Sequence, residues 1–187
     1  MEDFILLNGY NQNMIIHSTQ KLAKKLPIVS KEILSDNNPL GSWHVNLYVI
    51  ARRNCVMFCH DKIRFCLFIP ALKKAELENL DFWFRDAFAN TMLKLNYDAR
   101  IIEKALSFVT PLEFDTNSDR SVQGTMRVAH DDLHAILING PNLTDLRDAP
   151  AYSISAQLNE RPVTTKDMKY NDCLWPARDM KEFIEDL

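Results

Sequence analysis

The stretch Trp43–Ile69, with the sequence WHVNLYVIARRNCVMFCHDKIRFCLFI, decides the fold. Its alternation of apolar and mixed positions predicts three antiparallel strands joined by short turns. Successive side chains point to opposite faces, so two-residue turns at Arg52-Arg53 and Asp61-Lys62 would define the pairing. This pairing gives three rows on one nearly all-apolar face: Val49 with Val56 and Leu67, Leu47 with Phe58 and Phe65, and Val45 with His60 and Ile63.

The opposite face of this predicted meander is mixed in character. It carries His44, Asn46, Tyr48, Ile50, Cys55, Met57, Cys59, Arg64, Cys66 and Phe68, with Asn46, Cys59 and Arg64 in one row and Tyr48, Met57 and Cys66 in the next. Strand patterns usually report packing, so a covering helix is the simpler interpretation of this face. If the face is instead open to solvent, it forms a candidate ligand-binding surface.

The rest of the chain is typical of helices that need a sheet to pack on. Met14–His17 predicts one further short strand. Helical spacing of aromatic residues predicts a long helix over Lys74–Asn96, which would cover the apolar face of the meander. Further helices are predicted after Thr19, after Asp98, from Val122 to Asn139, over residues 153–158 and from Pro176. We therefore expect an α+β fold: an antiparallel sheet of three to five strands, built on the central meander (residues 43–69) and packed against several helices.

Length and composition place limits on the class of protein. The 187 residues predict a single domain over residues 14–187, with residues 1–13 as an N-terminal extension or Met14 as the native start. The net charge of −3 gives no support to nucleic-acid binding through phosphates. The chain has no apolar run near the ~18 residues of a membrane span, and its first residues lack the basic region of a signal peptide. These features predict a cytoplasmic protein.

The segment Asn117–Ser121 precedes a predicted helix and is a candidate anion site. Helix N-termini present free N–H groups and a partial positive charge. Arg120 and Ser121 could add charge-assisted bonds to a phosphate or carboxylate. The alternative is plain capping, in which Ser118 or Asp119 satisfies the helix end, and capping is the commoner use of such a segment.

Two other patterns resemble catalytic or metal-binding motifs. His130 and His134 stand four residues apart on one predicted helix face, as in the HExxH zinc motif, but Asp131 replaces the glutamate. A solvated helix face explains the two histidines equally well. His44 is a candidate acid or base on the mixed face, although the predicted pairing does not oppose it to Cys59. No GxSxG, GxGxxG or CxxC signature is present, so no cofactor is expected.

Four segments carry a resemblance to a known family: MIIHSTQKLAKKLP, PLGSWHVNLYVIARRNCVMFCHD, FDTNSDRSVQG and LNERP. With them the chain resembles a family of small bacterial proteins classed as a domain of unknown function. The resemblance covers about Met14 to the C-terminus, implies no activity and does not include the His130–His134 pair. It draws attention to Trp43, Asn46, Arg52, Arg53, Arg120 and Ser121.

Two functions follow as hypotheses. The first is a binding module of the bacterial cytoplasm that recognises a protein partner or a small anionic ligand, in a regulatory, toxin–antitoxin or phage-defence setting. Its ligand-binding residues would be Asn46, Tyr48, Arg64, Asn117, Arg120 and Ser121, with Arg52 and Arg53 at a hairpin tip as interaction residues. The second is an enzyme for a phosphorylated or nucleic-acid substrate, in which Arg64 and Arg120 hold the anion and His44 transfers a proton.

Overall fold

The computed structural model describes residues 13–140, 144–166, 168–169 and 172–187. The predicted N-terminal extension lies outside these residues, apart from Asn13. The elements in chain order are β1 (Met14–Ser18), α1 (Gln20–Ala23), β2 (Trp43–Ile50), β3 (Arg53–His60), β4 (Cys66–Leu72), α2 (Lys74–Leu77), α3 (Leu80–Lys94), α4 (Ala99–Ser107), β5 (Leu112–Asp115), α5 (Arg120–Asn139), the 3-10 helix η1 (Leu146–Asp148), α6 (Ala151–Asn159) and α7 (Pro176–Asp186).

The five strands form one open, mixed sheet in the order β4-β3-β2-β1-β5. The meander β2-β3-β4 is antiparallel, as predicted. β1 pairs in parallel with both β2 and β5, so the expectation of a purely antiparallel sheet is wrong. The reason is connectivity: α1 and a long loop return the chain to the sheet in the direction of β1, and the α3–α4 connection does the same before β5. None of the described helices has both the length and the apolar character needed to cross a membrane.

The predicted division of the meander into two faces is confirmed, but the pairing is shifted by two residues. Val45 pairs with Phe58, which pairs with Leu67. The first turn is Ala51-Arg52, with both residues at positive φ as in a type I′ hairpin. The second connection is a five-residue loop, residues 61–65, rather than a two-residue turn. A shift of two leaves every side chain on its predicted face, because side chains alternate with period two.

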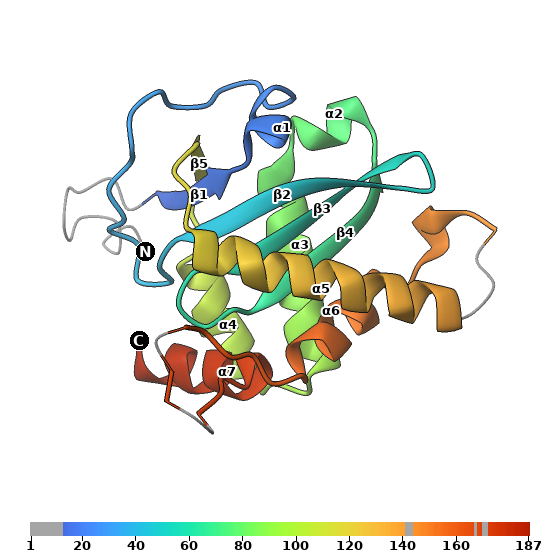
Figure 1. Ribbon diagram of the computed structural model, residues 1–187. Helices are drawn as coiled ribbons and strands as arrows, with labels where there is room; N and C mark the ends of the chain where they lie inside the picture. Colours follow the sequence, from blue (N-terminus) through green and yellow to red (C-terminus); the bar gives the residue numbers. More distant parts are fainter. Residues whose placement is uncertain (1–12, 141–143, 167, 170–171) are drawn as a thin grey trace, which may run out of the picture.

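Helices cover both faces of the sheet (Figure 1), with α5 and α6 on one side and α3, α4 and α7 on the other. On the apolar face, Trp43 meets Phe84 and Phe88 of α3 edge-on, with ring centroids 5.0 and 5.6 Å apart. The predicted long helix is therefore confirmed as the cover of this face, although it is divided into α2 and α3. On the mixed face, Met57 and Phe68 pack with Val122 and Met126 of α5.

The outer edge of β4 is closed by side chains of α6. Asn159 accepts a hydrogen bond from the Cys66 amide (2.7 Å) and donates one to the Cys66 carbonyl (2.8 Å). Two residues along the strand, the Phe68 amide donates to the Ser155 hydroxyl at 2.9 Å. These side chains satisfy the backbone groups that a sixth strand would otherwise pair with. In the LNERP segment, Asn159 therefore closes the edge of the sheet at β4.

Replacing Asn159 with alanine leaves a buried amide and a buried carbonyl of Cys66 without partners. We expect Asn159→Ala to lower the free energy of unfolding by about 2–4 kcal/mol, measured by urea denaturation. Gln157→Ala, on the exposed side of the same helix, serves as the control and should change it by less than about 0.5 kcal/mol. Equal losses in the two variants would show that α6 acts by packing alone.

Candidate functional site

The β3–β4 loop, residues 61–65, carries two charged side chains into the interior, and hydrogen bonds to His60 hold it in place. The amides of Lys62 (3.2 Å) and Ile63 (2.9 Å) donate to Nδ1 of His60. The proton of this imidazole is therefore on Nε2, which donates to the Leu40 carbonyl at 2.7 Å. Burial lowers the pKa of His60 to about 4, against an ordinary value of 6.5. A neutral, buried histidine thus determines where Asp61 and Arg64 lie.

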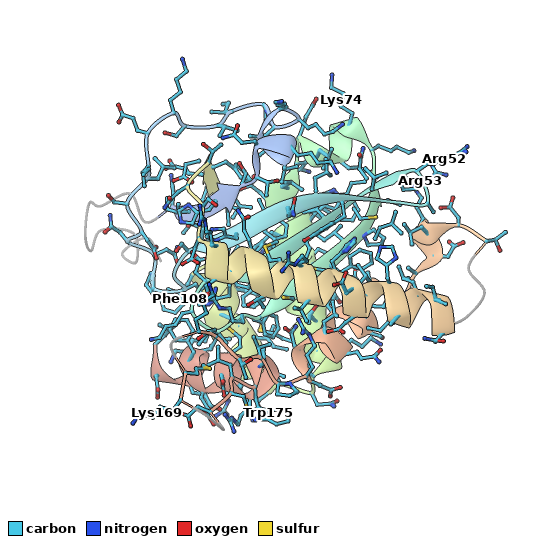
Figure 2. All side chains as sticks on the ribbon, viewed as in Figure 1. Arg52, Arg53, Lys74, Phe108, Lys169 and Trp175 are labelled. Atoms are coloured by element: carbon cyan, nitrogen blue, oxygen red, sulfur yellow. The ribbon has the colours of Figure 1, made fainter. Side chains whose placement is uncertain are left out.

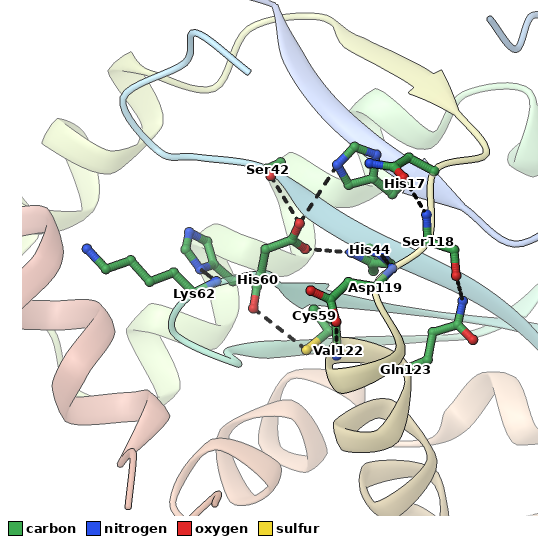
Figure 3. Close-up of polar contacts among 12 residues, drawn as sticks. His17, Ser42, His44, Cys59, His60, Lys62, Ser118, Asp119, Val122 and Gln123 are labelled. Carbon is green, nitrogen blue, oxygen red and sulfur yellow. Dashed lines mark hydrogen bonds and ion pairs between the residues drawn. The ribbon is translucent and has the colours of Figure 1, made fainter. Parts of the chain in front are cut away.

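Asp61 joins a cluster of two histidines and two aspartates that we call the histidine–aspartate cluster: His17, His44, Asp61 and Asp115. Figure 3 shows the two histidines side by side with Ser42. Nδ1 of His44 lies 2.7 Å from one Asp61 oxygen. Nε2 of His17 lies 3.8 Å from the other Asp61 oxygen, and Nδ1 of His17 lies 2.7 Å from Asp115. Although burial raises the pKa of Asp61, its hydrogen bonds from His44 and Ser42 and the charges of the two histidines lower it below its ordinary value.

The cluster attaches the start of α5 to the sheet, which removes His44 as a proton-transfer residue. The backbone amide of Asp119 donates to Nε2 of His44 at 2.9 Å, so the imidazole proton is on Nδ1 and faces Asp61. Both nitrogens of His44 are therefore engaged and the ring is buried. The prediction that His44 is not opposed to Cys59 is wrong, since the two residues are direct partners across β2 and β3. The engaged imidazole nevertheless offers that thiol no free base.

The capping alternative is confirmed at the N-terminus of α5. The Asp119 carboxylate accepts hydrogen bonds from the amides of Ser121 (2.6 Å) and Val122 (3.2 Å). Asn117 accepts one from the next amide in the turn, that of Ser118, at 2.9 Å. The side chain of Asn117 therefore shapes the turn and does not line the pocket described below. The acidic cap also occupies the amides that would otherwise bind an external anion.

Arg64 is a buried side chain whose hydrogen bonds are only partly formed in the described part of the protein. Only 8% of the residue is exposed, and its backbone is at a φ of +64°. Nη2 donates to the Ser121 hydroxyl at 3.1 Å. Nε and Nη1 are buried and have no acceptor among the described residues. A buried guanidinium normally pairs all of its N–H groups, preferably with an anion.

A pocket of about 260 Å³ lies between the first turns of α5 and residues 161–166. Arg64 does not line this pocket, but its hydrogen-bond partner Ser121 does. Its lining includes Ser121 and three cationic side chains, those of Arg120, Arg161 and Lys166. Nη1 of Arg161 pairs with Asp132 at 3.0 Å, and its Nε donates to the Leu158 carbonyl at 3.1 Å. Nη2 of Arg161 is buried without an acceptor among the described residues. We call this site the cationic pocket.

The structure brings together three of the predicted ligand-binding residues, Arg64, Arg120 and Ser121. It separates the rest from them. Asn46 accepts a hydrogen bond from the Thr19 hydroxyl, and Tyr48 donates one to the Met126 carbonyl beneath α5. The hypothesis that the mixed face is an open binding surface is therefore wrong, because α5 and α6 cover it.

The hairpin arginines lie far from the start of α5 (Figure 2). Arg53 pairs with Asp145 at 3.3 Å, whereas Arg52 is exposed in the turn. The Nε2 atoms of His130 and His134 lie 3.2 Å apart, and the His130 ring stacks on Tyr48. No group of three metal-binding side chains exists among the described residues. Within the described residues, His130 and His134 therefore lack the third side chain that a metal site of this kind needs.

The sequence did not identify Arg161, which lies in the LNERP segment, or Lys166, which lies between two predicted helices, as residues of the site. The signal for Arg161 was present in LNERP, where it follows Asn159 by two residues. It also missed Asp61 as the partner of His44, because the predicted two-residue turn placed Asp61 at a hairpin tip. The five-residue loop turns this carboxylate inward instead.

Comparison with known proteins identifies one family. Residues 15–179 match the family described as Domain of unknown function (DUF6933). The match confirms the resemblance predicted from the sequence. No curated protein and no solved structure matches significantly.

The buried, neutral His60 makes stability depend on pH. As pH falls from 6.5 to 4, the unfolded chain binds a proton at this residue and the folded chain does not. The free energy of unfolding therefore has its full value, as far as His60 is concerned, above pH 6.5. It falls by about 3 kcal/mol as the pH is lowered to about 4. Urea unfolding between about pH 7 and about pH 4.5 should record it.

His60→Gln should be less stable at neutral pH but should show a flatter pH dependence in the same range. His134→Gln is the matched control, since it removes a histidine that is partly exposed. If His60→Gln keeps the pH dependence of the natural protein, the assignment of that dependence to His60 is wrong.

Proposed function

We propose that this chain, which belongs to the DUF6933 family, binds a small anion in its cationic pocket. The observation that carries the proposal is Arg64: a buried guanidinium with two nitrogens lacking an acceptor in the described part of the chain, fixed to a hydroxyl that lines the pocket. A phosphate or carboxylate bound there would contact Arg120, Arg161 and Lys166, and it would place a negative charge next to Ser121, the hydroxyl to which Arg64 donates.

The charges around the pocket support an anion over a neutral ligand. Arg64, Arg120, Arg161 and Lys166 bring four positive charges, and Asp132 pairs with Arg161. An uncompensated buried charge is costly, so an apo protein of this kind retains unfavourable energy that ligand binding would release. The ligand would be of small size, because about 260 Å³ is below the usual range for drug-sized molecules.

The other hypotheses have less support. A protein partner would require an exposed surface, whereas the central cation of this site is buried. The enzyme hypothesis relied on His44, whose nitrogens both have partners in the fold. A location in the bacterial cytoplasm, and a regulatory, toxin–antitoxin or phage-defence setting, remain predictions from the sequence.

Gly124 allows the pocket to be closed without disturbing the fold. It lines the pocket on α5, and a Cβ atom added there would meet no other atom within 4 Å. Gly124→Met should therefore fill part of the pocket while favouring the helix by up to about 1 kcal/mol. Gly124→Ala is the matched control, with the same effect on the helix and little loss of pocket volume.

We expect inorganic phosphate to raise the melting temperature of the natural protein and of Gly124→Ala in a saturable way, beyond chloride at equal ionic strength. Gly124→Met and Arg64→Met should each weaken phosphate binding at least about tenfold, measured by calorimetry. Arg64→Met should also unfold no more easily than the natural protein, since it removes an unpaired buried charge.

Arg52→Ala, at the exposed hairpin turn, should bind phosphate like the natural protein. Equal affinity in all variants would assign the effect to general ion binding and would contradict the proposal. If Arg64→Met does not fold, Arg120→Ala tests the same pocket through an exposed residue.

A further inference from the structure

Two buried cysteines face each other next to the β3–β4 loop and take part in neither the histidine–aspartate cluster nor the pocket lining. Cys59 of β3 and Cys66 of β4 are direct cross-strand partners. Both are free thiols, with exposed fractions of 0% and 1%.

The hydrogen-bond pattern shows which kind of strand pair they form. Both backbone groups of Cys66 bond outward to Asn159 and not to β3. The neighbouring His60 amide donates across the ladder to the Phe65 carbonyl at 2.8 Å. Cys59 and Cys66 therefore occupy a non-hydrogen-bonded position of the antiparallel pair, where Cα atoms are about 4.5 Å apart and side chains are closest. That separation lies within the range over which a disulfide can form.

We propose that Cys59 and Cys66 are a redox-active pair that hydrogen peroxide converts into a reversible cross-strand disulfide. The site is distinct from the cationic pocket and does not depend on its ligand. The oxidant must be small, because the thiols are buried and a bulky disulfide reagent would not reach them. The other cysteines are less suited, since Cys55 lies four residues from Cys59, about 13 Å along the same strand.

The surroundings of the two thiols differ in a way that assigns their roles. The hydrogen bond from Cys59 and the positive charges of Arg161 and Arg64 lower the pKa of Cys66, against the effect of burial. Burial raises the pKa of Cys59. Cys66 is therefore the residue that supplies the thiolate, which is the nucleophilic form of cysteine.

The chemistry balances with one peroxide. The Cys66 thiolate attacks a peroxide oxygen, the O–O bond breaks, and a sulfenic acid forms while the released hydroxide takes up a proton as water. The Cys59 sulfur then attacks the Cys66 sulfur, the S–O bond breaks, and the thiol proton leaves with the second water. The two thiols supply two electrons to the peroxide, and a dithiol reductant reverses the change.

The test uses a full-length chain with Cys55→Ala and Cys173→Ser, which retains only the proposed pair. We expect peroxide to remove both thiols and to lower the mass by about 2 Da, as two hydrogen atoms are lost. Trypsin cleaves after Lys62 and Arg64, so Cys59 and Cys66 should appear in two peptides that are linked until dithiothreitol is added.

Further variants separate the pair from general oxidation. Cys59→Ala in the same background should lose the cross-link and show a mass gain from oxygen added at Cys66. In the natural chain, the link should join the same two peptides and leave Cys173 out. Stable sulfinic acid at Cys66 despite Cys59, a link to another cysteine, or thiols that survive peroxide sufficient to oxidise Cys173 would each overturn the proposal.

Discussion

Burial of both faces of the meander is the constraint on which the rest of the structure depends. α3, α4 and α7 cover the apolar face, and α5 and α6 cover the mixed face, so the buried polar side chains of the meander cannot rely on bulk solvent. Each one has to find a partner inside the protein. The pairing of His44 with Asp61 and with the Asp119 amide satisfies this demand and attaches α5 to the sheet. Among the charged side chains that the structure describes, Arg64 and Arg161 keep buried nitrogens without an acceptor, and this is why they identify the candidate site.

The β3–β4 loop and the strand ends beside it carry the residues that form the histidine–aspartate cluster, contact the cationic pocket and make up the cysteine pair. His60 shapes the loop, Asp61 serves the histidine–aspartate cluster, and Arg64 reaches the cationic pocket. Cys59 and Cys66 stand at the two ends of the same segment. A five-residue loop is long enough to turn two charged side chains inward, which a two-residue hairpin is not. The hydrogen bonds from the Lys62 and Ile63 amides to His60 hold the loop in place.

The cationic pocket and Arg64 bring together segments that are far apart in the chain. Arg120 and Ser121 begin α5, Arg64 lies in the β3–β4 loop, and Arg161 belongs to LNERP. In LNERP, Asn159 closes the edge of β4 and thereby brings Arg161 to the pocket two residues later. LNERP thus contains one residue that stabilises the sheet edge, Asn159, and one that lines the cationic pocket, Arg161. The family match over residues 15–179 includes all of these segments.

The sequence by itself determined the fold class, the two faces of the meander and the helix that covers its apolar face, because period-two and helical spacing survive an error of two residues in register. It also singled out Arg64, Arg120 and Ser121 by chemical type. Only the tertiary structure decided that β1 and β5 pair in parallel, that α5 and α6 cover the mixed face, and that His44 has no free nitrogen. These facts depend on loop lengths and on contacts between residues 57 to 98 positions apart, which local patterns do not encode. The physical reason is that the energetic effect of a charge depends on its burial. An arginine on the surface is solvated by water, whereas a buried arginine needs a hydrogen-bonding partner inside the protein.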